Sequence, residues 1–212
     1  MNRSNAFRQG EHICVVYYTA DEQRAVAAEY LADGLRRGER AYYVADTRAA
    51  LDRFHAALTA LGIDVEEALR TTALLEATHA EAHLRDGRFD SERMLRLLNE
   101  GIEAALNAGF VGLRTCGDMS WLLSEPPGAE QVVEYEALLN QLFSSTRACG
   151  MCQYDVSRLP LERLDHALAM HSTVVIDQEH KRNRFYRPAA HAGSPAARAE
   201  DFAWKLRELR QG

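Results

Sequence analysis

The sequence predicts a three-layer α/β domain, in which helices cover both faces of a mostly parallel sheet. Short runs rich in β-branched and aromatic residues alternate with longer segments whose apolar residues recur at helical spacing. The short runs are apolar at nearly every position, which is typical of parallel strands buried on both faces. A chain of 212 residues can bury one such core and carry a short appendage, but it is too short for two large domains.

About six strands and five or six helices are expected, in alternating order. Thr19 or Asp21 is suited to cap the first helix, and Gly38 to end it. The charged tract of residues 177–184 is expected to be a solvated loop or the return strand of a hairpin. The predicted strands cover residues 12–18, 41–46, 73–77, 111–116, 151–156 and 173–176, and the predicted helices cover 21–37, 48–61, a segment from 90 or 91 to just before 109, 129–147 and 161–171.

The character of the chain changes after residue 187. We interpret residues 1–187 as one domain, 188–194 as a linker with a proline and small residues, and 195–212 as an amphipathic helix. Ser194 and Pro195 suit the cap and the first position of that helix. The helix is expected to pack back on the domain or, as the alternative, to meet a partner, through the apolar residues Phe202, Leu206 and Leu209.

Composition excludes several classes of function. Lys and Arg number 25 and Asp and Glu number 31, so the net charge of −6 argues against binding nucleic acid. No apolar run approaches the roughly 20 residues that span a bilayer, and residues 1–5 lack the apolar core of a secretory signal. We therefore expect a cytoplasmic protein without a membrane partner, in which four cysteines are free thiols: Cys14, Cys116, Cys149 and Cys152.

The carboxyl ends of the predicted strands are the place to look for a ligand site. Residues 18–24, after the first strand, contain no glycine, no lysine and two carboxylates, which excludes a phosphate-binding loop there. Asp46, Asp118, Asp155 and Asp177 follow other strands, and capping of the next helix is the simpler expectation for Asp46 and an equal one for Asp155. A nucleotide hydrolase that uses Asp155 with magnesium would need a phosphate site that the sequence does not show.

His12 and Cys14 lie two residues apart on the first strand, so their side chains share one face. With Cys152 they offer a set of ligands for a soft metal or a haem iron. The favoured alternative is a buried thiol beside a histidine with a local hydrogen bond. The spacing of Cys149 and Cys152 resembles a dithiol motif, but it leads into a strand rather than a helix, which favours chance spacing.

An aromatic and polar group follows the fourth predicted strand. Arg114 lies on that strand, and Met119 and Trp121 come just after it. Such residues beside the carboxyl edge of a sheet can line an apolar pocket for a small molecule. The alternative is that Trp121 only covers the core.

Six segments together resemble the MEDS domain, the methanogen/methylotroph dichloromethane-regulator sensory domain. Each is modest alone, but their order and spacing are specific, and the similarity spans residues 7–187. The segments are Glu11-His12-Ile13-Cys14 through Tyr17 with Glu22-Gln23; Gly38-Glu39-Arg40 leading to Asp46; Gly87-Arg88-Phe89-Asp90 before Met94; Gly109-Phe110 to Trp121; Glu134-Tyr135-Glu136 to Asn140; and Cys152-Gln153-Tyr154-Asp155.

The resemblance implies a RecA/KaiC-like core without a phosphate-binding loop, and a non-catalytic sensory role without a cofactor. The ligand would be a small, hydrocarbon-derived molecule. We expect Trp121 and Tyr17 to supply apolar contact and Arg114 or His12 a polar contact, although His12 and Cys14 begin the first strand and so lie toward the opposite edge. The positions that match the family are His12, Cys14, Tyr17, Arg114, Asp118, Trp121, Tyr135 and Tyr154.

The resemblance also implies an output to transcription regulation. Family members are often joined to a helix-turn-helix, a histidine kinase or an anti-sigma-type ATPase module, whereas the residues after Arg187 have room for one helix. We therefore expect signalling through a separate protein, such as a kinase or an anti-sigma regulator, or through a homo-oligomer formed by the terminal helix. A metal- or haem-binding sensor that uses His12 and Cys14 is the alternative, and a pure interaction module is compatible with the first interpretation.

Overall fold

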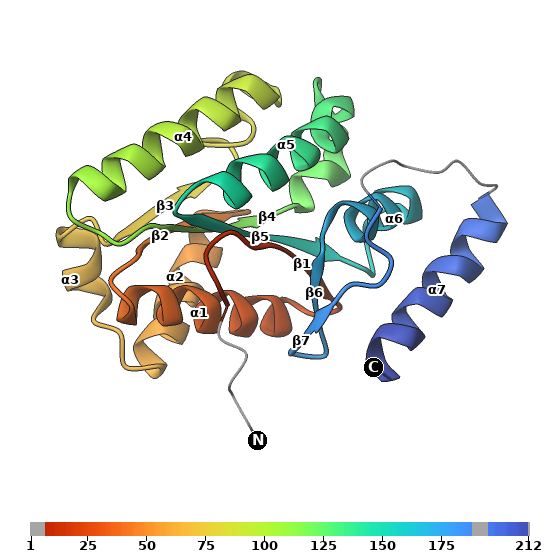
Figure 1. Cartoon of the computed structure of the whole chain (residues 1–212), viewed down its shortest axis with the longest axis horizontal. Coiled ribbons are helices and arrows are strands. Elements are labelled where there is room, and N and C mark those ends of the chain that lie inside the picture. The colour runs from red at the N-terminus through yellow and green to blue at the C-terminus, as the bar shows by residue number, and fades with distance from the viewer. Residues whose placement is uncertain (1–6, 188–194, 212) are drawn as a thin grey trace.

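The computed structural model describes residues 7–187 and 195–211. Their strands form one seven-stranded sheet in the order β3-β2-β4-β5-β1-β6-β7. Every neighbouring pair is parallel except β6 and β7, which form an antiparallel hairpin at one edge (Figure 1). The strands are β1 (His12–Tyr17), β2 (Arg40–Ala45), β3 (Leu74–Thr78), β4 (Leu113–Asp118), β5 (Ala148–Asp155), β6 (Thr173–Ile176) and β7 (Glu179–Arg182).

Helices cover both faces of this sheet, as the alternating sequence pattern predicts. Figure 1 shows α1, α2 and α3 on one face, α4 and α5 on the other, and α6 and α7 beside β6 and β7. The helices are α1 (Ala20–Arg36), α2 (Arg48–Ala60), α3 (Val65–Arg70), α4 (Ser91–Asn107), α5 (Val132–Ser145), α6 (Leu161–Met170) and α7 (Pro195–Gln211), with short 3-10 turns at Arg85–Gly87, Ser120–Ser124 and Ala129–Gln131.

The central strands are buried on both faces, and their side chains alternate between two apolar clusters. On β1, Ile13 and Val15 pack with α1 and α2, whereas Cys14 and Val16 pack with α4 and α5. This alternation follows from the strand period of two. It explains why the strand runs are apolar at nearly every position.

The expected helix cap at Asp46 is wrong, and the cap that the sequence leaves open at Asp155 does not form. Thr47, not Asp46, caps α2, because its hydroxyl accepts a hydrogen bond from the Ala50 amide at 3.2 Å. Asp155 closes the turn after β5 by accepting from the amide and hydroxyl of Ser157, and α6 begins without a side-chain cap. At the first place the neighbouring Thr47 caps the helix instead of Asp46. At the second place Ser157 binds the Asp155 carboxylate within the turn, so that carboxylate does not cap α6.

The largest differences from the predicted element boundaries lie in four places, and several other ends shift by one residue. The short helix α3 was not expected, β4 begins two residues later, and the helix expected over 129–147 divides into a 3-10 turn and α5. Strand β5 begins at Ala148, so Cys149 and Cys152 both lie inside it and point to opposite faces. These two thiols therefore cannot act as a pair. The charged tract forms the turn and β7 of a hairpin, one of its two expected forms.

The terminal helix α7 packs back on the domain, mainly against α6. Phe202, Leu206 and Leu209 are buried, and Trp204 meets the edge of the Phe185 ring at 5.2 Å between centroids. The predicted linker, residues 188–194, lies outside the described residues. Among the helices that are described, none combines the length and the apolar character needed to cross a bilayer.

Candidate functional site

The turn between β1 and α1, where related folds could hold phosphate, is filled by the chain's own side chains. The Thr19 hydroxyl accepts from the Glu22 amide at 3.2 Å, and the Glu22 carboxylate accepts from the Tyr18 amide at 2.9 Å. This is a reciprocal cap in which a carboxylate takes the position of an anion at the helix N-terminus. The turn that the sequence predicts to lack a phosphate-binding loop is therefore capped by the chain's own side chains.

A cavity of about 620 Å³, here called the edge cavity, opens at the carboxyl edge of the sheet. Trp121 lines it, but only 3% of Trp121 is exposed, because its ring lies between His83 and Phe89 at centroid distances of 5.5 and 4.7 Å. Its indole Nε1 has no hydrogen-bond partner. The other lining residues include Asp46, His79, Asp86, Ser120 and Arg158.

Asp118 and Tyr17 meet near this edge. The Tyr17 hydroxyl donates to Asp118 Oδ1 at 3.4 Å, and the amide and hydroxyl of Ser120 also donate to the same carboxyl group. Burial raises the pKa of Asp118, a change that His79 and Ser120 partly oppose. Through the two hydrogen bonds from Ser120, Asp118 fixes the start of the loop that carries Trp121.

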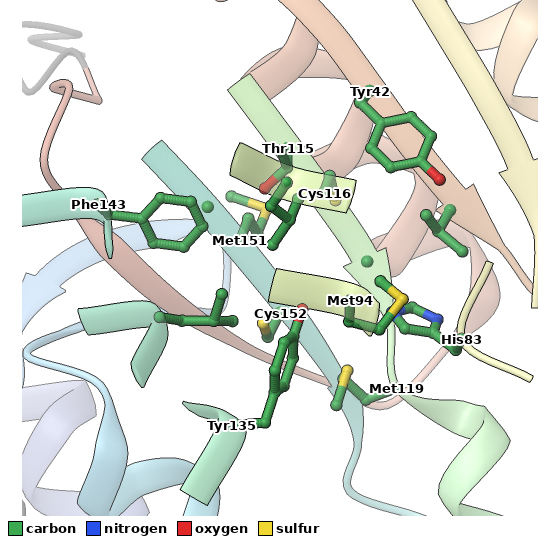
Figure 2. A pocket seen from close by; sticks show the side chains of 15 residues that line it. Tyr42, His83, Met94, Thr115, Cys116, Met119, Tyr135, Phe143, Met151 and Cys152 are labelled. Carbon is green, nitrogen blue, oxygen red and sulfur yellow. The ribbon is translucent and has the colours of Figure 1, made fainter. Parts of the chain in front are cut away.

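A second cavity of about 30 Å³, here called the inner cavity, lies between the sheet and helices α4 and α5. Figure 2 shows Phe143 at one end and His83, Met94 and Met119 at the other. The lining is mainly apolar, with polar groups from Thr115, Tyr42, Tyr135 and His83. Five of the lining residues contain sulfur: Met94, Cys116, Met119, Met151 and Cys152.

His83 connects the two cavities. It lines the inner cavity, and its ring stacks on Trp121, which lines the edge cavity. Burial, together with the nearby charge of His79, lowers the pKa of His83 to about 3, so this imidazole is neutral at physiological pH. Its Nδ1 is buried without a hydrogen-bond partner. A neutral, unsatisfied nitrogen beside an apolar cavity can orient a small ligand.

Arg114 does not reach either cavity. It points to the opposite face of the sheet, under α1, where its Nε donates to Glu39 at 2.5 Å and Asp33 lies 3.3 Å from a terminal nitrogen. Gly34 permits this approach, because a Cβ there would lie 2.6 Å from the Arg114 side chain. The expected role of Arg114 as the polar contact of a pocket near Trp121 is therefore wrong, since neighbouring strand residues face opposite ways.

His12 also lies away from Trp121, because β1 begins at His12 as expected. It joins a fully buried cluster on the α5 face: Glu136 Oε2 is 3.1 Å from His12 Nε2 and 3.2 Å from His171 Nε2. Cys152 Sγ is 3.5 Å from His12 Nε2. We call His12, Glu136, Cys152 and His171 the imidazole–carboxylate cluster.

Burial and the neighbouring groups shift the pKa values of the carboxyl and imidazole groups in this cluster. Burial opposes ionisation of Glu136, but the two histidines at hydrogen-bond distance hold its pKa below the ordinary value. Burial and the neighbouring His171 lower the pKa of His12. Tyr154 donates its hydroxyl to Glu136 Oε1 at 2.8 Å. The predicted site residue Tyr154 thus acts on this cluster, and Tyr135 lines the inner cavity.

Sequence reasoning missed Glu136 and His171 as members of the cluster. Cys14, which the sequence paired with His12, lies next to Cys152 in the sheet but is not among the converging groups. A signal for Glu136 was present: it falls on the buried stripe of α5, in line with Val132, Leu139 and Phe143. The converging ligand atoms lie within 4.8 Å of one another in a buried setting, which does not accommodate a haem.

Four cysteines are free and buried. Burial raises the pKa of Cys14, Cys116 and Cys152, and raises that of Cys149 to about 11. A thiol must ionise to act as a nucleophile, so these environments disfavour covalent catalysis by the free thiols.

The family model named MEDS, described as the methanogen/methylotroph, DcmR sensory domain, matches residues 11–172. The chain belongs to the MEDS family. The match covers β1 through α6 and includes all four members of the imidazole–carboxylate cluster. No curated protein matches the MEDS chain in sequence.

Two solved structures resemble the fold of this MEDS domain. The flagellar accessory protein FlaH from Methanocaldococcus jannaschii has a TM-score of 0.57 at 12% identity, over 89% of this chain and 85% of that chain. The KaiC-like protein PH0186 from Pyrococcus horikoshii OT3 has a TM-score of 0.54 at 15% identity, over 89% and 84%. At such identities the likeness shows the fold alone, which is RecA/KaiC-like, as the sequence resemblance implied.

Proposed function

We propose that this MEDS domain is a non-catalytic sensor that binds a small apolar molecule in the inner cavity and signals to transcription regulation through a partner protein. The observation that supports it best is the cavity itself, enclosed by apolar side chains of the sheet, α4 and α5. The family is described as sensory, which agrees with this role. The filled helix N-terminus after β1 disfavours a nucleotide as the ligand.

The size of the inner cavity limits the ligand. Its volume is about 30 Å³, and one water requires about 10–15 Å³ on the same scale, so two or three heavy atoms fit. Apolar cavities of this kind stay dry and take apolar guests. The thioethers of Met94 and Met119 are polarizable and flexible, which lets the cavity adapt to a halogenated or alkyl guest.

His83 supplies the polar contact in this proposal, in place of Arg114. Its unsatisfied Nδ1 and the hydroxyls of Tyr42, Tyr135 and Thr115 are the polar groups of the lining. The edge cavity is the entrance, and rotation of the stacked His83 and Trp121 rings opens the way inward. Trp121 thus keeps a role in binding as part of the gate rather than as the floor of an open pocket.

Methyl NMR of the full chain tests this proposal, with dichloromethane as a three-atom apolar probe. Met94, Met119 and Met151 line the inner cavity, whereas Met170 does not. We expect saturable shifts of the methyl signals of the three lining methionines, assigned by Met→Leu variants, and none at Met170. A bulkier probe such as toluene should leave all four signals unchanged. Absence of saturable shifts, or shifts centred on Met170, would contradict the proposed pocket.

A pair of glycine variants sharpens this experiment. Gly117→Ala places a methyl group in the lining, with its Cβ 3.4 Å from the His83 ring. Gly101→Ala makes the same change on α4, with its Cβ 3.4 Å from Leu113 and outside the cavity. We expect Gly117→Ala to weaken dichloromethane binding about tenfold, equivalent to roughly 1.4 kcal/mol, and Gly101→Ala to leave it unchanged. Equal effects of the two variants would count against the inner cavity.

The output passes to a separate protein in this proposal. The apolar face of α7 is occupied by α6, and Trp204 is a large apolar residue of α7 that remains 46% exposed. Light scattering of the full chain, with and without dichloromethane, separates the two expected outputs. A monomer in both conditions supports a separate partner protein, and a concentration-dependent dimer that Trp204→Ala abolishes supports a homo-oligomer.

A further inference from the structure

We propose that the imidazole–carboxylate cluster of His12, Glu136, Cys152 and His171 is a structural binding site for a divalent metal ion of the zinc class. The inference does not depend on the ligand proposed for the inner cavity. It rests on the convergence of four metal-binding side chains from β1, α5, β5 and the segment between α6 and β6.

Hydrogen bonds fix which nitrogen of each histidine faces the centre. The Nδ1 of His171 is 2.7 Å from the Ala167 carbonyl oxygen, which can only accept, so Nδ1 carries the hydrogen. The Nδ1 of His12 faces Asn140 Oδ1 at 3.3 Å. The amide nitrogen of Asn140 donates to the carbonyls of Glu136 and Met170, which fixes its orientation and makes Oδ1 an acceptor. In the neutral form of each imidazole, Nε2 therefore presents a lone pair to the centre, where it is free to bind a cation.

These lone pairs face a carboxylate oxygen rather than a donor. Glu136 Oε2 lies 3.1 and 3.2 Å from the two Nε2 atoms, so three electron-rich atoms meet in a buried place. Glu136 Oε2 and His171 Nε2 have no hydrogen-bond partner. Acceptors left facing one another in a buried site are costly. A cation at the centre would be bound by all of them at once.

The distances agree with tetrahedral coordination. Zinc bonds of about 2.0–2.2 Å to nitrogen and oxygen and about 2.3 Å to sulfur place neighbouring ligand atoms roughly 3.4–3.6 Å apart. The observed separations are 3.1, 3.2 and 3.5 Å, and all ligand atoms lie within 4.8 Å of one another. Two imidazoles, one thiolate and one carboxylate form a donor set that suits zinc better than magnesium or calcium.

The surrounding residues resemble the outer shell of a metal centre. Asn140 and the Ala167 carbonyl orient the two histidines, and Tyr154 donates to the other oxygen of Glu136 at 2.8 Å. Such contacts orient metal ligands and raise their basicity. Four protein ligands with almost no exposure leave no open position, which is typical of a structural rather than a catalytic site.

Charge and protons balance in the proposed binding step. The Cys152 S–H bond breaks, its proton passes to the solvent buffer, and a sulfur–metal bond forms. The thiolate and the Glu136 carboxylate together carry two negative charges, which the divalent ion neutralises. Cys152 also lines the inner cavity, so the metal site holds one wall of that cavity in place.

Cobalt substitution in the full chain tests the site. Tetrahedral Co²⁺ with a thiolate ligand shows sulfur-to-metal charge transfer in the near ultraviolet and strong visible d–d bands. We expect both to saturate at about one equivalent and to disappear when Zn²⁺ is added, as for one closed tetrahedral site. A wild-type chain without the charge-transfer band at one equivalent of Co²⁺ would overturn the proposal.

Matched variants identify the ligands. Cys14 pairs with Cys152 in the sheet register and is also buried on the same face, but it lies outside the cluster. We expect Cys152→Ala to lose the charge-transfer band and Cys14→Ala to keep it. The reverse result would overturn the ligand set. Tyr154→Phe removes only a hydroxyl group, so it is less disruptive to folding than the cysteine variants. It should weaken Co²⁺ affinity about tenfold. Unchanged affinity would overturn the role of Glu136 as a ligand.

Discussion

Two glutamates, Glu39 and Glu136, are almost equally buried on opposite faces of the same sheet, at 4% and 3% exposure. Glu39 is paired with a permanent cation, because Arg114 donates to it at 2.5 Å, and Gln9 donates to its other oxygen. Glu136 instead faces two histidines and a thiol, and receives one hydrogen bond from Tyr154.

The two glutamate sites differ in whether a permanent cation lies beside the carboxylate. Arg114 is held by Glu39, Asp33, two backbone carbonyls and the face of Tyr30, so this cluster contains its own permanent cation. Around Glu136 the charged forms of two neighbours are disfavoured, because burial lowers the pKa of His12 and raises that of Cys152. Glu136 therefore has no permanent cation beside it, and the proposed divalent ion would supply that positive charge.

Removing the permanent cation should have the largest effect. Arg114→Met leaves Glu39 buried and unpaired, so we expect a loss of about 3–5 kcal/mol in the free energy of unfolding. Urea unfolding followed by circular dichroism measures this loss. Added zinc or chelator should not change the difference between this variant and the wild type, because the two clusters lie on separate faces of the sheet. A zinc-dependent difference would mean that the clusters are coupled.

Removing the proposed metal ion should have the next largest effect. With free zinc at 100 times its dissociation constant, the bound ion adds about 2.7 kcal/mol of stability to the folded state. We expect a chelator to remove that amount from the wild type and nothing from Cys152→Ala. Parallel urea titrations with and without chelator provide the measurement. If the two proteins respond alike, zinc stabilises the fold somewhere other than at Cys152.

A third buried polar group, His83, carries no charge at neutral pH. Its pKa of about 3 in the folded state lies below the ordinary value of 6.5, so protonation favours unfolding. This contribution is complete above pH 6.5 and is lost as the pH falls from there toward 3, with a slope of up to about 1.4 kcal/mol per pH unit. His83→Phe keeps a ring against Trp121 and should flatten the slope of stability between pH 6.5 and 4.5. Equal slopes would show that His83 is accessible to protons in the folded state.

An exposed ion pair provides the reference for a small effect. Arg70 makes two hydrogen bonds to Glu67 on α3, yet both side chains are more than half exposed. Arg70→Met should change the free energy of unfolding by less than about 1 kcal/mol, and 1 M salt should remove most of that change. A loss comparable with that of Arg114→Met would mean that burial does not explain the difference between these pairs.

Local features were readable from the sequence. The strand runs, the helix starts at Thr19 and Asp90, the filled turn after β1 and the hairpin tract depend on residues close in the chain. Trp121 and Tyr135 were also expected near a cavity, and they line the edge cavity and the inner cavity. Where a neighbouring polar residue competed, as Thr47 did with Asp46, local reasoning chose wrongly.

The sequence by itself determined the alternation of the main strands and helices, the family and the expected lack of a phosphate loop, because these depend on spacing within short segments. Only the tertiary structure decided which side chains meet. His12 and Glu136 are more than a hundred residues apart, and they come together because β1 lies beside β5 under α5. Strand order and the direction of each side chain arise from packing of the whole core. The separation of Arg114 from the cavities, and the meeting of Glu136 with His12, Cys152 and His171, could therefore not be predicted from sequence spacing.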